Sequence, residues 1–418
     1  MMTISSLKKE TKNQEIEGLP DPPYVMMSLL GYQSQLKPLV EPGIHVLQYQ
    51  LIAQSENNWS IKLHAPISGI VDVVEYNGQN YIKITNDFKN ERMVCVPPKL
   101  AALNNQDILR VIRDAGIVGS GGAGFPTHIK YDVADRPITH FIINGAECEP
   151  YLSADYSLMN QEENHLWKTV QVIQKLIKAK YVILAIEKQN RELKKKIEHQ
   201  ISQLNINIKV QLLGNDYPQG SELQLIKTVT GKIIPKGSIP AHHGVIVSNI
   251  GTIKAIANAL YQGIPYTERI VTVSGEKAKT RGNFLLKIGT PIHHILEQIG
   301  QDWQPDDQQI ILGGPMMGKA VTHSEESISK GTGGLLLLRH LKTEVFNCIQ
   351  CGYCADVCPQ KLMPMEFARH AVRGNSDGLN QFDLKSCIEC GACAYVCPSD
   401  VPLMSSIITG KQLIKTKL

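Results

Sequence analysis

The sequence predicts an α/β chain of several domains, on the basis of three observations. Its 418 residues exceed what one hydrophobic core usually holds, so about three or four domains are expected. Strand-like and helix-like segments alternate between about residues 105 and 265, which indicates a largely parallel sheet covered by helices. Eight of the ten cysteines lie in two copies of one short pattern near the C-terminus.

Composition and charge exclude several classes of protein. The chain is 43% hydrophobic and 20% charged, which is typical of soluble globular proteins. Its formal net charge of +4 is small for this length and argues against a dedicated nucleic-acid binder. The longest purely aliphatic run, Leu335 to Leu338, is far shorter than the roughly 20 apolar residues that span a bilayer. Any attachment to a membrane is therefore expected to come through a partner.

Two modules are expected before the alternating region. Residues 1–37 are polar and then interrupted by Pro20, Pro22 and Pro23, which predicts an irregular N-terminal arm. The arm has no apolar signal segment, so we expect a reducing cytosol. Residues 38–98 alternate short β-prone pieces with turns and resemble the barrel-sandwich modules of lipoyl and biotinyl carriers. The carriers' modifiable lysine is missing, so the segment 64–69 is interpreted as a structural turn.

Residues 99–265 are predicted to form a Rossmann-like α/β domain. We expect strands at residues 141–144, 181–186, 208–213 and 245–248, and helices at 165–178, 191–203, from about 221 and from about 252. Ligands of such sheets bind at the C-terminal ends of the strands, where residues 144–149 and 214–220 fall.

Residues 266–340 return to β structure with one helix near 294–299, which predicts a β-grasp-like module. Residues 341–418 hold both cysteine runs, with a helix expected between them at 366–373.

Each cysteine run reads C-x2-C-x2-C-x3-C-P, the spacing of bacterial ferredoxins that hold [4Fe–4S] clusters. The runs comprise Cys348, Cys351, Cys354 and Cys358, followed by Pro359, and Cys387, Cys390, Cys393 and Cys397, followed by Pro398. In two-cluster ferredoxins the fourth cysteine of each run ligates the other cluster. We therefore assign Cys348, Cys351, Cys354 and Cys397 to the first cluster, and Cys387, Cys390, Cys393 and Cys358 to the second. A structural zinc site would leave the third cysteine of each run surplus. The C-terminal region is thus predicted to be a two-cluster, ferredoxin-like helical domain.

A glycine-rich loop, GSGGAG, occupies residues 119–124. It matches the pattern G-x-G-x-x-G, but a helix-like segment precedes it where a dinucleotide fingerprint requires a strand. We reject that fingerprint for this reason. Backbone amides without side chains can still approach a flat ring or a phosphate closely. The alternative is a crowded turn between a helix and a loop.

Polar residues follow the strand expected at 141–144. Asn144, Glu147 and Glu149 lie there, and carboxylates at this position could accept hydrogen bonds from ribose hydroxyls or ring nitrogens. Solvated loop acids are the alternative. The two glutamates flank Cys148 and disfavour its thiolate, so this cysteine is not expected to be a nucleophile.

Together, GSGGAGFPTHIK and NGAECEP resemble the flavin-binding signature of the NADH-oxidising subunit of respiratory complex I. A closer resemblance is to the C subunit of the Rnf electron-transport complex, over roughly residues 38–402. That family shares GGAGFPT, NGAECEPYL, YPQG-x-E, GGPMMG and both cysteine runs in the same order. The resemblance implies bound FMN, two [4Fe–4S] clusters and NAD(H) as substrate.

The resemblance also implies a role for each matching residue. The flavin cradle and its cation would come from Gly119, Gly121, Gly122, Gly124, Thr127 and Lys130. Asn144, Glu147 and Glu149 would contact the flavin and the nucleotide, and Phe125 would stack on the nicotinamide. Tyr217 and Glu222 would close the pocket, with Asn249 and Thr252 at the phosphate end. Ser120 and Ser221 replace an arginine and an acid of the complex I pattern. Both replacements weaken the resemblance at the nucleotide site more than at the flavin site.

By this resemblance the chain would be a peripheral subunit at the cytoplasmic face of the inner membrane. It would couple electron transfer between NADH and ferredoxin, or another carrier, to ion translocation by its partner subunits. One alternative is a soluble flavo-iron–sulfur reductase, such as the cobalamin reductase of bacterial microcompartments. The other is an electron carrier or scaffold without flavin, against which the retained glycine loop argues.

Overall fold

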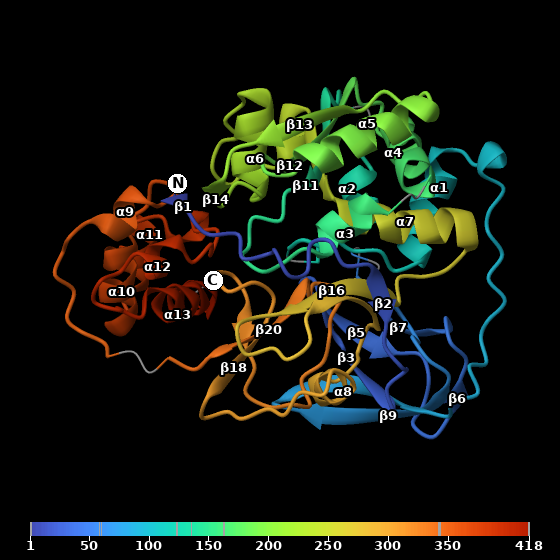
Figure 1. Ribbon diagram of the computed structural model, residues 1–418, viewed down its shortest axis with the longest axis horizontal. Helices are drawn as coiled ribbons and strands as arrows, with labels where there is room; N and C mark the ends of the chain where they lie inside the picture. The colour runs from blue at the N-terminus through green and yellow to red at the C-terminus, as the bar shows by residue number, and fades with distance from the viewer. Residues whose placement is uncertain are drawn as a thin grey trace.

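The computed structural model describes residues 2–57, 59, 61–122, 124–134, 136–161, 164–341 and 344–416. Figure 1 shows the C-terminal helices on one side of the molecule, the α/β domain above, and the β structure below it. The N-terminal segment runs between these parts before it enters the β structure.

Two four-stranded sheets form the N-terminal β module. One has the order β3 (Tyr24–Ser28), β10 (Gln79–Asn86), β9 (Gly69–Tyr76) and β6 (His45–Val46). The other has the order β4 (Leu30–Gly31), β5 (Ser34–Pro38), β7 (Leu51–Ser55) and β8 (Lys62–His64). Alternating side chains such as Val25, Ile82 and Ile84 are fully buried in its core.

The N-terminal arm is shorter and more ordered than predicted. The β module begins at Tyr24, inside the segment expected to be irregular, because the prolines end before β3 and an apolar run follows them. Two short strands precede it. β1 (Met2–Thr3) pairs with β14 (Asp216–Tyr217), and β2 (Ile16–Gly18) pairs in parallel with β17 (Gly282–Lys287). Strands of two or three residues carry too little periodicity to be seen in sequence.

The α/β domain has a parallel sheet of the order β13 (Lys209–Leu213), β12 (Tyr181–Glu187), β11 (His140–Gly145) and β15 (Val245–Asn249). Its helices are α1 (Asn105–Asp114), α2 (Thr127–Tyr131), α3 (Ala154–Asn160), α4 (Asn164–Leu176), α5 (Arg191–Gln203), α6 (Glu222–Thr230) and α7 (Ile250–Gln262), with 3-10 turns η1 (Leu100–Ala102) and η2 (Pro240–His243). Helices α4, α5 and α7 pack on the sheet face that includes Phe141 and Ile143. Helix α6 covers the opposite face with Ile142. The expected strands and helices are present, with ends shifted by a few residues.

The next module is a six-stranded mixed sheet with one helix. Its order is β19 (Lys319–Ala320), β18 (Gln308–Leu312), β20 (Gly334–Arg339), β16 (Glu268–Ser274), β17 and β2. Helix α8 (Ile292–Gln298) packs its Ile292 and Ile295 against the sheet residues Val271 and Ile310. The predicted combination of strands with one helix is therefore present, while the name β-grasp stays a prediction.

Short helices make up the C-terminal domain. They are α9 (Tyr353–Asp356), α10 (Pro364–Val372), α11 (Ser376–Gln381), η3 (Leu384–Ser386), α12 (Ala392–Tyr395) and α13 (Leu403–Thr416). Gly352 and Gly391 precede α9 and α12 with φ of 82° and 74°, so each cysteine run turns at a residue in the left-handed region. Within the described residues, none of the helices combines the length and apolarity needed to cross a bilayer.

Candidate functional site

The glycine loop lies beside the N-terminus of α7, and hydrogen bonds to buried side chains hold it there. The Ser120 amide donates a hydrogen bond to Thr252 Oγ1 over 3.0 Å, and Ser120 Oγ lies 2.8 Å from the Tyr266 hydroxyl. Thr252 is buried, so it holds the loop in place where the resemblance implied a direct contact with phosphate. Thr127 is also buried, at the start of α2. Both threonines therefore support the loop from inside the protein.

Two neighbouring glycines of this loop meet different surroundings. A Cβ on Gly121 would lie 3.2 Å from Asn249 Cβ, whereas a Cβ on Gly122 would meet nothing within 4 Å. Asn249 caps α7 by accepting a hydrogen bond from the Gly251 amide over 2.7 Å. The exposed glycine backbone thus faces open space next to the start of a thirteen-residue helix, an arrangement that favours a phosphate or another anion.

A cavity of about 740 Å³ opens beside α1, α2 and η2, and Phe125 connects its wall to the end of the glycine loop. Phe125, Lys130 and Glu222, which the sequence predicted as site residues, line it together. The other predicted site residues do not line it, namely the loop glycines, Thr127, Asn144, Glu147, Glu149, Tyr217, Asn249 and Thr252. Lys130 Nζ donates hydrogen bonds to Glu222 Oε1 over 3.1 Å and to the Val247 carbonyl over 3.0 Å. The other lining residues include three arginines that sequence reasoning missed, Arg110, Arg113 and Arg136. A cavity of this size is typical of sites for small molecules and cofactors, and its cations favour phosphate-bearing ones.

The end of β11 is fixed by Asn144. Its Nδ2 donates to the Gly220 carbonyl over 2.9 Å, and its Oδ1 accepts from the Ala146 amide over 3.0 Å. Glu147 follows, and its carboxylate accepts a hydrogen bond from the Tyr156 amide over 3.1 Å at the start of α3. Burial, and then the nearby Asp155, raise the pKa of Glu147. These two residues hold the strand end, and the Glu147 carboxyl is directed at α3.

Glu149 contacts the GGPMMG loop, and Tyr217 contacts the C-terminal domain. Glu149 Oε2 accepts from the Met316 amide over 3.0 Å, and Glu149 Oε1 lies 3.2 Å from the Tyr217 hydroxyl. That hydroxyl also donates to the Cys390 carbonyl over 2.7 Å. Burial raises the pKa of both side chains. The GGPMMG loop and the second cysteine run therefore meet the α/β domain at two residues that the sequence assigned to the flavin pocket.

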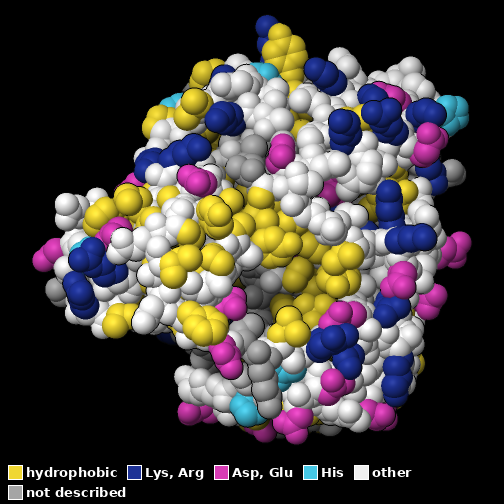
Figure 2. Space-filling view, turned by 60° about the vertical axis from the view of Figure 1, so that its left-hand side comes forward, with side chains coloured by type: hydrophobic (Ala, Val, Ile, Leu, Met, Phe, Trp, Pro, Cys, Tyr) yellow, Lys and Arg dark blue, Asp and Glu magenta, His cyan; other side chains and the backbone are white. Residues whose placement is uncertain are grey.

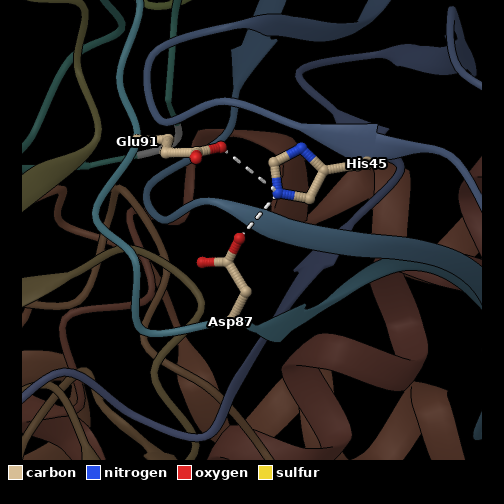
Figure 3. A group of neighbouring side chains, drawn as sticks. All are labelled: His45, Asp87 and Glu91. Atoms are coloured by element: carbon tan, nitrogen blue, oxygen red, sulfur yellow. Dashed lines mark hydrogen bonds and ion pairs between the residues drawn. The ribbon is translucent and has the colours of Figure 1, made fainter.

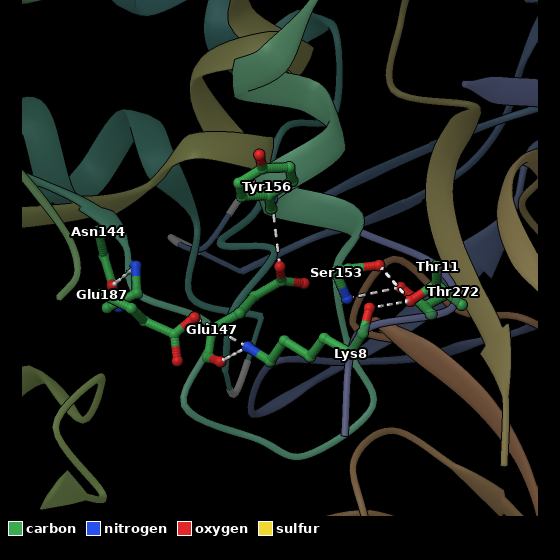
Figure 4. Close-up of polar contacts among 9 residues, drawn as sticks. Lys8, Thr11, Asn144, Glu147, Ser153, Tyr156, Glu187 and Thr272 are labelled. Carbon is green, nitrogen blue, oxygen red and sulfur yellow. Dashed lines mark hydrogen bonds and ion pairs between the residues drawn. The ribbon is translucent and has the colours of Figure 1, made fainter. Parts of the chain in front are cut away.

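Lys8 of the N-terminal arm reaches the same strand ends, as Figure 4 shows. Its Nζ donates to the Glu147 carbonyl and lies 3.0 Å from Glu187 Oε2, while its side chain is only 6% exposed. Further along the arm, Ser153 Oγ donates to Thr11 Oγ1 over 2.7 Å. Sequence reasoning missed Lys8, because a lysine in a polar segment gives no sign that it is buried.

The cysteines fall into two groups in space. Cys358, Cys387, Cys390 and Cys393 line one cavity, which we call the inner site. Burial, together with the neighbouring thiols of Cys390, Cys387 and Cys358, raises the pKa of Cys393 to about 12. The thiols of Cys348 and Cys351 act in the same way on Cys354. We call Cys348, Cys351 and Cys354 the outer site. The crossed assignment predicted from the sequence would add Cys397, which is half-buried.

This grouping fits iron–sulfur clusters. The inner site offers four thiols to one space, which is the ligand number of a [4Fe–4S] cluster. The amides of Leu362 and Glu389 donate to Cys358 Sγ and Cys387 Sγ, each over 3.4 Å. Such hydrogen bonds to sulfur stabilise the negative charge of a bound cluster. The grouping also supports the assignment of Cys358 to the cluster of the second run.

Two further groups stand outside these sites. Burial raises the pKa of Cys148 to about 12, which agrees with the expectation that it is not a nucleophile.

In the β module, His45, Asp87 and Glu91 lie close together (Figure 3). His45 Nε2 is 2.6 Å from Asp87 Oδ2, and Asp87 also accepts from Ser68 Oγ over 2.7 Å. These bonds lower the pKa of Asp87 well below its usual range. They explain the three side chains as a structural polar contact within the β module.

Family models match three parts of the chain. The RnfC barrel sandwich hybrid domain matches residues 2–87, the Nuo51 FMN-binding domain matches residues 112–258, and the 4Fe–4S dicluster domain matches residues 347–401. They confirm a barrel-sandwich N-terminal domain, an FMN-binding type of α/β domain and an iron–sulfur C-terminal domain.

A solved structure shares the fold of much of the chain. It is an NAD⁺-reducing [NiFe]-hydrogenase in the H₂-reduced state, with a TM-score of 0.53 and 18% sequence identity. The match covers 75% of this chain and 63% of the hydrogenase chain. At this identity the likeness shows the fold alone.

Curated relatives cover most of the chain. The C subunit of the Clostridium ljungdahlii proton-translocating ferredoxin:NAD(+) oxidoreductase complex is 36% identical over 85% of this chain and 80% of the relative. The C subunit of the Acetobacterium woodii Na(+)-translocating ferredoxin:NAD(+) oxidoreductase complex is 32% identical, over 81% and 79%. The C subunit of a Vibrio cholerae ion-translocating oxidoreductase complex is 36% identical, and the chain spans only 46% of its length. From the order of its three matched domains and this identity to full-length relatives, the chain belongs to the Rnf family, the C subunits of ion-translocating oxidoreductase complexes.

Proposed function

We propose that the chain is the peripheral electron-transfer subunit of an ion-translocating ferredoxin:NAD oxidoreductase complex, with FMN and two [4Fe–4S] clusters as its cofactors. The observation that carries the proposal is the direct contact between the α/β domain, which is of the FMN-binding type, and the inner site. Tyr217, at the edge of the α/β domain's ligand region, donates a hydrogen bond to the backbone of the inner-site ligand Cys390. A flavin-binding domain that contacts a cluster site in this way would allow electrons to pass between the two within one chain.

The residues around the cavity supply position and charge. The open backbone at Gly122 admits a ligand close to the start of α7, where amides without intrahelical partners favour a phosphate. Lys130, held by Glu222 and the Val247 carbonyl, places a cation at the cavity wall. FMN bound here would supply the exchange between the two-electron chemistry of a nicotinamide and the one-electron chemistry of the clusters.

Partners are proposed from the outer site. Cys348 and Cys351 are exposed, and so are the neighbouring apolar side chains of Phe346, Ile349 and Tyr353. Exposed apolar surface of this kind is typical of protein contacts, and Figure 2 shows hydrophobic side chains gathered across the middle of the face it presents. We propose that the chain lies at the cytoplasmic face of the membrane. Membrane subunits of the complex, and ferredoxin or a similar carrier, would dock to this apolar surface.

The cofactor content tests the proposal directly. The full chain, reconstituted anaerobically with iron, sulfide and FMN, is expected to bind one flavin and two clusters, measured by flavin release on denaturation and by iron and sulfide content. Protein with clusters but no flavin would favour the flavin-less carrier. Mass spectrometry of gently solubilised membranes then separates a complex subunit from a soluble reductase, because only the former is found with membrane partners.

Phe125 tests the nucleotide part of the site. Phe125→Ala removes an aromatic ring from the cavity wall, so we expect weaker binding of NADH, by about 1 kcal/mol or more. The measurement is the NADH concentration needed for half-maximal rate of flavin reduction, with dithionite reduction unchanged. Phe88→Ala is the matched control, since Phe88 is 61% exposed in the β module. Equal NADH dependence in both variants would place the nucleotide elsewhere.

A further inference from the structure

We infer that Asp155, on helix α3, is a positioning residue for the phosphate end of the flavin site, and that it takes up a proton when the phosphate binds. This inference rests on the proposed function, because it assumes that FMN places its phosphate at the start of α7. Asp155 follows the NGAECEPYL motif and belongs to none of the patterns identified in the sequence.

The first observation is that Asp155 fixes the amide group of Asn249. Asn249 Nδ2 donates a hydrogen bond to Asp155 Oδ2 over 2.6 Å, and Asn249 Oδ1 accepts one from the Gly251 amide over 2.7 Å. An amide side chain has one donor end and one acceptor end, so these two bonds allow only one orientation. The cap of α7 therefore depends on Asp155 for its geometry.

The second observation is that the glycine loop packs on this pair of side chains. A Cβ on Gly121 would lie 3.3 Å from Asn249 Nδ2. A Cβ on Gly251, the second residue of α7, would lie 3.5 Å from Ser120 Cβ and 3.8 Å from Asp155 Oδ1. The loop, the start of α7 and the Asp155 carboxyl group therefore meet at one place. A shift of Asn249 would move both backbone segments that a phosphate can approach.

The third observation is that Asp155 brings a negative charge to a place that favours anions. Its carboxyl group lies next to the N-terminus of α7, where backbone amides attract a phosphate. The carboxylate accepts a hydrogen bond from a neutral amide, and no ion pair joins it to a cation among the described residues. A phosphate close to a carboxylate raises the pKa of that carboxyl group, because the protonated form avoids the repulsion. Arrival of the phosphate therefore favours uptake of a proton from solvent.

The neighbouring segments bring further charges to α3. They are Lys8 and Lys12 of the arm, Glu147 after β11, Glu187 of β12, Lys196 of α5 and Arg269 of β16. Lys8 pairs with Glu187 over 3.0 Å, and Arg269 donates to the Lys330 carbonyl, so both cations are bonded elsewhere. Burial raises the pKa of Asp155, and burial with the charge of Asp155 raises that of Glu147. The two carboxyl groups therefore already favour a proton, and a phosphate adds to this preference.

Proton uptake sets the direction of the pH dependence. When the complex holds more protons than the free site, binding weakens as the pH rises, by up to about tenfold per pH unit. A phosphate ester has its own second ionisation at roughly pH 6, so its charge is nearly constant above about pH 7. A fall in FMN affinity above about pH 7 is thus the effect expected from Asp155 and Glu147.

Two substitutions of Asp155 separate its roles. Asp155→Asn keeps an oxygen that accepts from Asn249 and removes the charge, so FMN should still bind, without the fall in affinity at high pH. Asp155→Ala removes the acceptor as well, and binding about tenfold weaker is expected at every pH. The measurement is calorimetric titration of FMN into the full, cluster-containing chain at about pH 7 and about pH 8.5. Asp306→Asn is the matched control, because Asp306 is exposed and lies just before β18.

The wild type gives a second readout that needs no variant. Heats of FMN binding in buffers of different ionisation enthalpy count the protons exchanged, and net uptake is expected above about pH 7. Zero uptake, or an equal loss of affinity at high pH in the wild type and Asp155→Asn, would refute the proton role. Wild-type affinity in Asp155→Ala would refute the positioning role. Should Asp155→Ala not fold, Asp155→Asn and the proton count still decide. A wild-type chain that binds no FMN at either pH would contradict the proposed function itself.

Discussion

Gly121 and Gly122 are adjacent, yet only one of them has protein atoms where a side chain would stand. Gly122→Val places its side chain in open space, so the fold should tolerate it, and the loss of flavin should then report close approach of a ligand. Gly121→Val should also lose flavin, but through contact with Asn249. Flavin fluorescence after denaturation measures both, with electron paramagnetic resonance to confirm intact clusters.

The control for these variants is Gly18→Val, which introduces the same side chain at another open position. It should keep full flavin. Retention of full flavin in Gly122→Val as well would show that the loop is not the cradle, and that its glycines serve only the turn between α1 and α2.

His64 predicts a pH dependence of stability. It is buried in the β module, and its Nδ1 has no hydrogen-bond partner among the described residues. Burial, with Lys330 and Lys62, lowers the pKa of His64 from 6.5 to about 3. The unfolded chain therefore binds more protons below pH 6.5, and stability is lost as the pH falls, at up to about 1.4 kcal/mol per pH unit.

The measurement is the fall in apparent Tm between about pH 7.5 and about pH 5.5. His64→Leu should show a smaller fall than the wild type, and the exposed His199→Leu should behave like the wild type. An equal fall in all three proteins would mean that His64 becomes protonated in the folded state without cost.

At the scale of elements, one buried cation, Lys8, is among the contacts that hold the N-terminal arm. Lys8→Met leaves Glu187 without its ion pair and the Glu147 carbonyl without its donor, which should cost about 3 kcal/mol. We expect a lower apparent Tm and earlier proteolysis within the arm. Lys9→Met is the control, because Lys9 is exposed.

A second substitution tests whether the unpaired Glu187 carboxylate causes this loss of stability. Adding Glu187→Leu to Lys8→Met removes the unpaired carboxylate and should recover part of the stability. No recovery would indicate that the arm is held by its other contacts, such as those of Thr11.

The cysteine runs also allow a specific prediction, about which cluster Cys358 ligates. If the fourth cysteine of each run crosses over, Cys358→Ala should abolish the same paramagnetic signal as Cys387→Ala, and leave the signal that Cys348→Ala abolishes. The inner-site cavity, which includes Cys358, supports this outcome. A Cys358→Ala spectrum that matches Cys348→Ala would show that each run closes its own cluster.

The sequence predicted those parts of the site that short patterns encode. The cysteine spacing, the glycine loop and the α/β alternation are local, and the structure contains each of them. The partners that individual side chains contact could not be predicted from the sequence. Glu149 and Tyr217 belong to motifs of the ligand region, yet they bond to Met316 and Cys390, which are distant in sequence. Lys8 was missed for the same reason, since its partners Glu147 and Glu187 lie far along the chain.

At the scale of the whole molecule, the contact between the C-terminal domain and the α/β domain joins the inner site to the α/β domain. Pairs such as Tyr217 and Cys390, or Met316 and Gly391, come from different modules and exist only when all of them are assembled. The proposed electron transfer within the chain would therefore depend on how the domains pack against each other, as well as on the residues of each site.

The arm described above has a consequence for how the chain folds. Residues 2–3 pair with residues 216–217, and residues 16–18 pair with residues 283–285. During synthesis these early segments leave the ribosome long before their partners do, and such long-range pairing is slow. Residues 2–3 and Lys8 can dock once the α/β domain has been made, whereas residues 16–18 must wait for strand β17. A nascent chain that stalls before residue 283 lacks the partner of residues 16–18, so the arm is fully docked only after the α/β domain and strand β17 have been made.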